Sequence, residues 1–289
     1  MQKSAAETVT RYLFLGFLLI LGPHLAEAQP HRVVSQTVGT DELLLAVADP
    51  GQIAALSHLA RDSDFSAIAT EAGAYPILQV NGDAEDILQY APTLALVADY
   101  SRHELVEQVR RAGVEVMVFD QYDTLEETYA NLRRLAKALG TEERAEAVIS
   151  ACRERVARLA STLADQEPVK VIAPSTYGVI AGSRTTFQDL CDHAAAENLA
   201  ATLGELVGHV PPPNERMLIW PIDIVVVAGE TFDDALAPYR DLPPYSLMPA
   251  VREGRAVALK PWHLGCVSHY RIEAYEYFAR ALHPDAFRP

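Results

Sequence analysis

The chain has 289 residues and a formal net charge of −15, because it carries 39 acidic side chains but only 24 lysines and arginines. This balance argues against nucleic acid and anionic membrane surfaces as partners, since both are recognised through basic patches. The length is sufficient for one large domain or for two lobes that each bury a core.

Residues 1–28 have the parts of a cleavable secretory signal peptide. A polar stretch precedes the apolar run 12–21, which is too short to cross a bilayer because a spanning helix needs about 20 apolar residues. Ala26 and Ala28 supply the small side chains that a signal peptidase reads. We therefore predict secretion into the periplasm, with the mature chain starting at Gln29. An uncleaved membrane anchor is the alternative.

Strand and helix patterns alternate between residues 31 and 119. The expected strands are 31–35, 53–56, 93–98 and 114–119, and the expected helices are 42–47, 83–90 and 101–112. Thr40 or Asp41 can cap the first of these helices, and Gly113 can end the third. Alternation of this kind predicts an α/β fold with a parallel sheet and helices on both faces.

A helical region without strand signals follows. Apolar residues recur at helical spacing between 125 and 165, and the pattern restarts at Thr141 with acidic residues suited to a helix N-terminus. This region is either a rigid connection between two lobes or an ordinary pair of surface helices. Beyond it, the expected strands are 169–173, 222–228 and 255–259, and the expected helices are 186–193 and 268–282.

The two alternating parts predict two Rossmann-like α/β lobes, residues 29–124 and 166–289, joined by a long helix over 125–165. Each lobe has an acidic residue, Glu85 or Glu215, that leads a short helix before a buried strand. Two such lobes form a cleft between them, and clefts of this kind are where small ligands usually bind.

Motifs of catalysis and cofactor binding are missing from the sequence. It contains no GxSxG, HExxH, P-loop or GxGxxG pattern, so we expect a binding protein with no cofactor and not an enzyme. His263 and His269 are six positions apart, which is a loose spacing for a metal site. The three cysteines, Cys152, Cys191 and Cys266, are either buried thiols or include one disulfide, Cys191–Cys266.

The order and spacing of several segments resemble one family. These segments are 32–35, 40–43, 85–88 with Pro92, 111–116, 182–187, 197–200 and 273–284. Together they resemble the helical-backbone (class III) periplasmic solute-binding proteins of ABC importers for iron–siderophores, haem and cobalamin. The chain departs from that family where Pro-Asp usually precedes each buried strand, because it has Pro92-Thr93 in one lobe and Ile222-Asp223 in the other.

The resemblance implies a partner and a docking mode. The partner is an ABC permease and ATPase complex in the inner membrane, and the binding protein is expected to be a monomer. By position, Glu85 and Glu215 resemble the family's two glutamates that pair with permease arginines. One fixed negative charge on each lobe would set the docking register.

The cleft should be lined by loops at the carboxyl ends of the strands. The candidate ligand-binding residues there are Asp41, Arg61, Tyr100, Arg102, Tyr122, Tyr177, Arg184, Trp262, His263 and Tyr270. Aromatic faces suit a planar ring, and arginines suit carboxylates or the negative charge of a chelate.

The resulting hypothesis is a protein that captures a metal chelate, either an iron–siderophore or a cobalamin-like ring, for import. One alternative is the same fold holding a bare metal ion, an oxyanion or another small molecule. Another is a periplasmic chelatase-like enzyme, with Asp41, Asp99 or His263 as its base.

Overall fold

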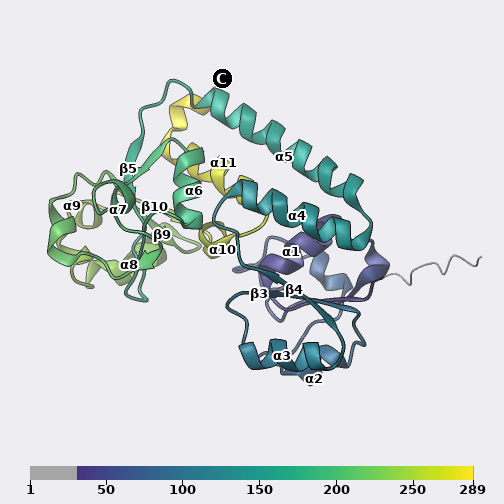
Figure 1. Ribbon diagram of the computed structural model, residues 1–289. Coiled ribbons are helices and arrows are strands. Elements are labelled where there is room, and N and C mark those ends of the chain that lie inside the picture. Colours follow the sequence, from purple (N-terminus) through teal and green to yellow (C-terminus); the bar gives the residue numbers. More distant parts are fainter. Residues whose placement is uncertain (1–30, 289) are drawn as a thin grey trace, which may run out of the picture. The chain divides into compact units, whose positions relative to one another are not determined.

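Two four-stranded parallel sheets form the centres of two lobes (Figure 1). The computed structural model describes residues 31–288, so the predicted signal peptide and its cleavage site lie outside the described residues. The N-terminal sheet has the order β2-β1-β3-β4, with strands Val33–Ser35 (β1), Ile53–Ala55 (β2), Leu94–Ala98 (β3) and Glu115–Phe119 (β4). The C-terminal sheet has the order β10-β9-β5-β7, with strands Val169–Ile172 (β5), Ala196–Asn198 (β7), Ile224–Ala228 (β9) and Ala256–Leu259 (β10).

Helices cover both faces of the N-terminal sheet, as the alternating pattern predicts. Leu94 and Leu96 face the helices Val38–Val47 (α1) and Leu125–Leu139 (α4), whereas Ala95 and Val97 face Ala84–Leu88 (α2) and His103–Arg111 (α3). Figure 1 shows the sheet between these two pairs of helices. Successive side chains of a strand point to opposite faces, so a strand that is buried on both faces is apolar throughout.

Helix α1 begins earlier than the sequence pattern predicts. Its N-cap is Thr37, not Thr40 or Asp41. The Thr37 hydroxyl accepts a hydrogen bond from the backbone N–H of Thr40 at 3.3 Å, and the Thr40 hydroxyl accepts one from the N–H of Thr37 at 3.2 Å. This reciprocal cap satisfies N–H groups that the first turn cannot pair internally, and it places Asp41 inside the helix.

The C-terminal lobe contains several elements that the pattern misses. Besides the expected Thr186–His193 (α6) and Arg271–Leu282 (α11), it has helices Leu199–Thr202 (α7), Phe232–Arg240 (α8), Pro249–Arg252 (α9) and Pro261–Gly265 (α10), and an antiparallel pair, Ile180–Ala181 (β6) with His209–Val210 (β8). Strand β7 reads Ala-Glu-Asn, which has low intrinsic strand propensity, and α8 contains Pro238. Short 3₁₀ helices complete the chain at Pro50–Gln52 (η1), Glu71–Ala74 (η2), Asn214–Ile219 (η3), Tyr245–Leu247 (η4) and Pro284–Phe287 (η5).

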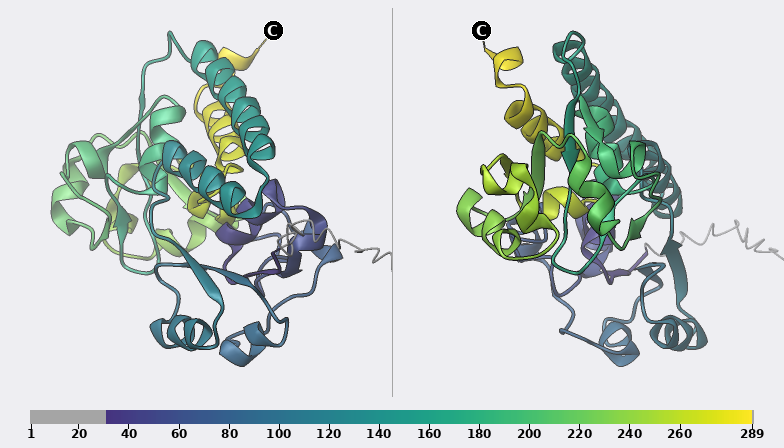
Figure 2. Two further views of the ribbon diagram at one scale, coloured as in Figure 1. Left: turned by 45° about the vertical axis from the view of Figure 1, so that its right-hand side comes forward. Right: turned by 90° about the vertical axis from the view of Figure 1, so that its left-hand side faces the viewer.

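The expected helical region is present as two helices, α4 and Glu142–Thr162 (α5). Gly140, with φ of 71°, ends the first helix in the left-handed conformation, and the second helix starts after Thr141. Near the start of α5, Arg144 donates hydrogen bonds to backbone carbonyls at the end of α1, and further along Arg155 pairs with Glu276 of α11 at 2.8 Å. Helix α5 therefore contacts both lobes, and it lies beside α11 in two views (Figures 1 and 2).

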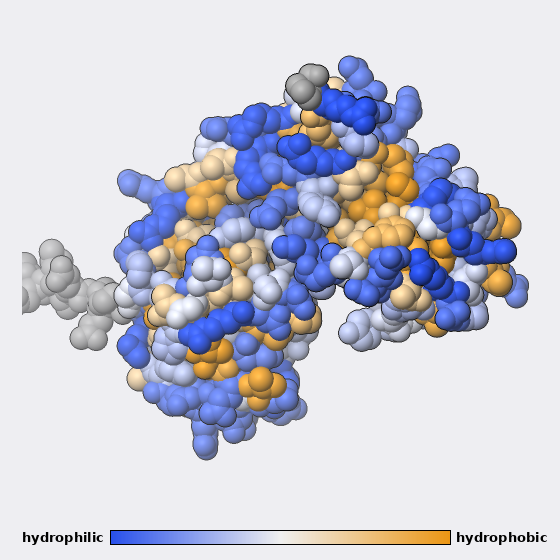
Figure 3. Space-filling model, turned by 180° about the vertical axis from the view of Figure 1, so that it is seen from behind, coloured by the Kyte–Doolittle hydropathy of each residue, from blue (hydrophilic) through white to orange (hydrophobic). Residues whose placement is uncertain are grey.

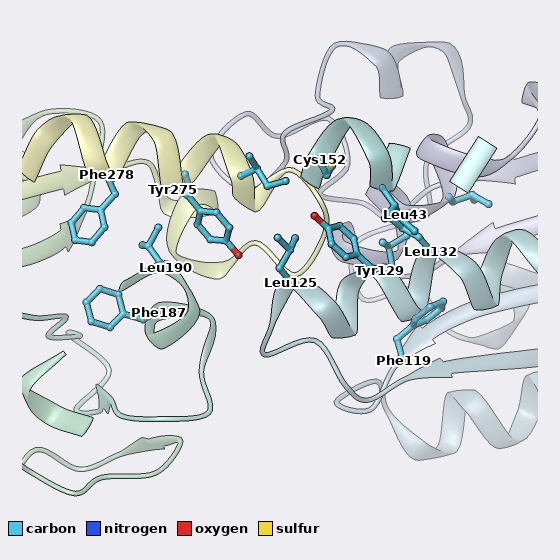
Figure 4. Packing of buried hydrophobic residues seen from close by; sticks show 14 of the residues in the cluster. Leu43, Phe119, Leu125, Tyr129, Leu132, Cys152, Phe187, Leu190, Tyr275 and Phe278 are labelled. Carbon is cyan, nitrogen blue, oxygen red and sulfur yellow. The ribbon is translucent and has the colours of Figure 1, made fainter. Parts of the chain in front are cut away.

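One apolar core continues from lobe to lobe. It includes Leu43 and Leu132 of the N-terminal side, Cys152 of α5, and Phe187 and Phe278 of the C-terminal side (Figure 4). Closely packed interiors resist large rearrangement, so we expect small hinge motion between the lobes. All three cysteines are buried free thiols, so the Cys191–Cys266 disulfide considered from the sequence does not form.

A buried ion pair lies where the lobes join. The guanidinium of Arg271 donates to the carboxylate of Asp189 at 2.8 Å, and both side chains are almost fully buried. Arg271 also donates to the carbonyls of Tyr122 (2.6 Å) and Cys266 (3.0 Å), while the Tyr275 hydroxyl donates to Asp189. The pair thereby fixes α6, α11 and the segment that crosses between the lobes.

Candidate functional site

A pocket of about 450 Å³ lies at the carboxyl edge of the N-terminal sheet. Its walls come from segments 36–39, 57–59, 78–83 and 100–102, and its floor comes from segment 261–267 of the C-terminal lobe. The space-filling view from behind shows the surface hollowed between the two lobes, with mostly blue and pale side chains along the hollow (Figure 3). The carboxyl ends of parallel strands are the expected place for a ligand in such folds.

The floor of the pocket lies directly against the first turn of α1. A Cβ atom added to Gly39 would lie only 2.2 Å from Cγ2 of Val267, so a larger residue there would force the Val267 side chain to move. The hydroxyl of Thr128 donates to the carbonyl of Val267 at 3.1 Å and holds the same segment from the side of α4. The position of the floor is therefore set by contacts from the N-terminal lobe.

Replacing Gly39 with alanine should displace the Val267 side chain at an overpacking cost of about 1–3 kcal/mol. Because alanine gains about 1 kcal/mol over glycine inside α1, the free energy of unfolding should fall by up to about 2 kcal/mol. The measurement is denaturant unfolding, together with hydrogen exchange of the 266–268 amides, which should become faster. Gly51→Ala is the matched control, because nothing lies within 4 Å of a Cβ there. Equal stability of the two variants would contradict the close contact at Gly39.

Glu42 connects the pocket wall to the floor. Its carboxylate is only 2% exposed, and it accepts hydrogen bonds from the Ser268 hydroxyl at 2.6 Å and from the backbone N–H of Ala67 at 3.0 Å. Burial raises the pKa of Glu42 above its ordinary value, and these hydrogen bonds partly oppose the rise. The carboxylate therefore joins α1, the 58–68 loop and the floor of the pocket.

Asp41 lies one layer behind the pocket and does not line it. The backbone N–H of Ser57 donates to its carboxylate at 3.0 Å, and the Ser57 hydroxyl donates to it as well, while Ser57 itself lines the pocket. Burial raises the pKa of Asp41 to about 8, although these hydrogen bonds favour the ionised form. Its role in the structure is to fix the end of β2.

Trp262 and His263 have different environments although they are neighbours. Trp262 is 7% exposed and lines the pocket, whereas His263 packs beneath it, with ring centroids 4.2 Å apart, and also contacts the ring of Tyr277. Neither ring nitrogen of His263 has a hydrogen-bond partner among the described residues. Burial lowers the pKa of His263 to about 4, so the imidazole is held neutral.

Acidification should destabilise the protein through His263. The pKa of His263 is about 4 in the folded state and 6.5 ordinarily. At a pH between these two values the imidazole is protonated in the unfolded state and neutral in the folded state, so acid favours unfolding. Lowering the pH from 7 to 5 should reduce the free energy of unfolding by about 2 kcal/mol through this residue. A His263→Phe variant should lose that part of the pH dependence in urea unfolding series, and identical pH slopes for the two proteins would contradict it.

The structure brings three of the ten predicted ligand-binding residues to the pocket: Tyr100, Arg102 and Trp262. Tyr122 lies beside it, where its hydroxyl donates to Asp99 at 2.8 Å. The ring of Tyr270 contacts that of His269 at a tilt of 39°, and Tyr270 does not line the pocket.

The predicted arginines mostly lie elsewhere. Arg61 donates to the carbonyls of Ala72 and Tyr75. Arg184 is exposed on the surface of the C-terminal lobe, and so is Tyr177, whose exposed fraction is 92%. Neither residue lines the pocket.

Several lining residues are absent from the ligand-binding residues that the sequence predicts, among them the acids Glu42, Asp83 and Asp86. His58 and Phe65 are two others, and both belong to the loop that follows β2. His58 contributes the only imidazole among the lining residues that the structure describes, and the Phe65 ring is 51% exposed. Nothing in the sequence distinguishes these two side chains from the other members of the loop.

The two glutamates expected at a docking surface are exposed. Glu85 is the second residue of α2, and Glu215 is the second residue of η3. Each precedes the first residue of its buried strand, β3 or β9, by nine positions. The two glutamates therefore occupy equivalent places, each as the second residue of a short helical element before a central strand.

Two further observations concern metals and membranes. Within residues 31–288, no three His, Cys, Asp or Glu side chains are grouped so that they could hold a metal ion. In the same range, no helix combines the length and the apolar character needed to span a bilayer.

Comparison with known proteins agrees with this architecture. Residues 33–261 match the family model described as periplasmic binding protein. A curated relative, a cobalamin-binding protein of Halobacterium salinarum, is 22% identical over 266 residues, which cover 89% of this chain and 70% of the relative.

Solved structures share the two-lobed fold. A periplasmic haem-binding protein of Pseudomonas aeruginosa superimposes with a TM-score of 0.74 at 24% identity, covering 88% of this chain and 93% of that one. A periplasmic vitamin B12-binding protein of Vibrio cholerae gives a TM-score of 0.69 at 16% identity, covering 90% and 99%. Because the family model covers most of the sequence, the chain belongs to the periplasmic binding protein family.

Proposed function

We propose that the protein is exported through the signal peptide 1–28, captures a metal chelate in the periplasm and delivers it to an ABC permease and ATPase. The observation that carries the proposal is the pocket between the edge of the N-terminal sheet and the 261–267 floor. Membership of the family supports the transport role, and the named ligands of the relatives, cobalamin and haem, support the ligand class. We propose no reaction on the ligand and a monomeric carrier.

The side chains of the pocket suit a flat chelate. Phe65 and Tyr100, at 51% and 67% exposure, present aromatic faces at its rim, and Trp262 lines it from the side of the floor. Aromatic faces provide a large contact area for planar rings. His58 lines the same pocket, and its imidazole is the proposed ligand for a chelated metal that keeps an open position.

The proposed docking residues are Glu85 and Glu215, one on each lobe. Their carboxylates are exposed on short helices that precede the central strands β3 and β9. Two negative charges on lobes that share one core would give a permease two points at a fixed separation.

Trp262 provides the direct test of the pocket. Replacing it with alanine should weaken the binding of cobalamin or haem at least about tenfold, because a large buried aromatic contact is lost. Affinity is measured by titration followed through ligand absorbance, after the protein purified from its own host has been examined by native mass spectrometry for a bound chelate. Trp220→Ala is the matched control, because Trp220 lies against Gly204 and outside the pocket. Unchanged affinity of a folded Trp262→Ala variant would contradict the assignment.

A further inference from the structure

The charged side chains on the pocket wall are mainly acidic. Among the described lining residues, Glu42, Asp83 and Asp86 are acids, and Arg102 is the one lysine or arginine. The remaining titratable side chains among the described lining residues are His58, in the loop after β2, Tyr100, and the buried thiol of Cys266.

The single arginine is oriented by a backbone contact. The guanidinium of Arg102 donates to the backbone carbonyl of Gly82, which also lines the pocket. Arg61 and Arg184, which the sequence suggested as partners for carboxylates of a ligand, do not line the pocket. An anionic ligand would therefore meet three carboxyl side chains and one guanidinium, whose charge is not cancelled by its bond to a neutral carbonyl.

The acids are held in place by uncharged donors. Asp86 accepts hydrogen bonds from the backbone N–H of Gln79 at 2.8 Å and from the side-chain amide of Gln89 at 2.7 Å. Glu42 is held in the same way by Ala67 and Ser268. Such donors orient a carboxylate without cancelling its charge, so these side chains cannot readily turn away from an incoming anion.

We propose that this pocket selects chelates whose periphery carries no negative charge, and that Glu42, Asp83 and Asp86 enforce the selection. The inference rests on the proposed function and names its substrate class: an uncharged chelate with carboxamide or ester groups is accepted, and one with carboxylate groups is disfavoured. An anion in the pocket faces the side chains of Asp83 and Asp86, and beside Glu42, whose pKa is raised by burial, it either meets a third negative charge or promotes protonation of that carboxylate. The net charge of −15 acts in the same direction at longer range.

Matched ligand pairs test the selection. Cobalamin is compared with its monocarboxylic acid, in which one peripheral amide is hydrolysed, and haem with its dimethyl ester. In each pair the form with more carboxylates should bind about five- to tenfold more weakly, as expected for unit charges several ångströms apart at an intermediate dielectric. Asp83→Asn should reduce the ratio of affinities between the two forms of a pair. Asp64→Asn should not, because Asp64 is exposed and does not line the pocket. Equal or tighter binding of the carboxylate forms overturns the inference and leaves the proposed function intact.

A measurement without ligand distinguishes a failure of this inference from a failure of the proposed function. A thiol is introduced by His58→Cys in a Cys266→Ser background, because Cys266 lines the same pocket, and the other two native thiols are buried. Its reaction rates with a cationic and an anionic methanethiosulfonate of similar size are compared. The preference for the cationic reagent should exceed that at Gln108→Cys, an exposed control on α3, by about fivefold, and Asp83→Asn should reduce it. Equal preferences at the two thiols overturn the inference. If no chelate binds, the proposed function fails, and the thiol rates alone decide whether the pocket repels anions.

Discussion

Replacing Arg271 with methionine is expected to lower the free energy of unfolding by about 3–5 kcal/mol, the largest loss of stability expected from a single substitution considered for this protein. The change leaves the carboxylate of Asp189 buried without its cation, since both side chains are almost fully buried and 2.8 Å apart. It also removes the donor for the carbonyls of Tyr122 and Cys266. Equilibrium unfolding in guanidinium chloride measures the loss.

Two comparisons make the result specific. Arg155→Met breaks a partly exposed pair with Glu276 at 2.8 Å, and it should cost no more than about 1 kcal/mol. The double variant Arg271→Met/Asp189→Asn should recover part of the loss, because the uncompensated charge is removed as well. If Arg271→Met and Arg155→Met cost the same, the junction does not depend on the buried pair.

Reversing the charge of both proposed docking residues, Glu85→Lys with Glu215→Lys, should abolish ligand uptake while ligand affinity stays within about twofold of the parent. In the proposed docking mode, two attractive contacts with permease arginines would become repulsive, which would change both affinity and register at the docking surface. The residues are exposed and outside the pocket, so binding of the chelate should be unaffected. Uptake into proteoliposomes that contain the transporter is measured beside a binding titration.

The control for this variant changes the net charge equally. Glu104→Lys with Glu230→Lys also reverses one exposed glutamate on each lobe, but neither residue lies on α2 or η3. This control should keep most of the uptake. Normal uptake by the Glu85/Glu215 variant, or equal loss in both variants, would show that docking does not depend on these two positions.

The sequence by itself determined the elements whose signals are local. Continuous apolar runs such as Leu94–Ala98 and Ile224–Ala228 identify buried parallel strands, and Gly140 followed by Thr141 marks the break between α4 and α5. The order of these elements was enough to predict the two-lobed α/β class and the family resemblance, and both are confirmed. These features follow from backbone preferences and from the spacing of apolar residues along each element, and both can be read from residues that are close in sequence.

Only the tertiary structure decided which side chains form the pocket and what their charges face. Glu42 and Ser268 are 226 residues apart in sequence, yet they share a hydrogen bond beside the floor, and Gly39 lies directly against the side chain of Val267. Arg61 appears in the sequence as a free cation, but its donors are taken by backbone carbonyls. Burial and contacts between distant segments set these properties, and no local pattern encodes them. The sequence therefore located the cleft, whereas the packed lobes determined that its wall is acidic.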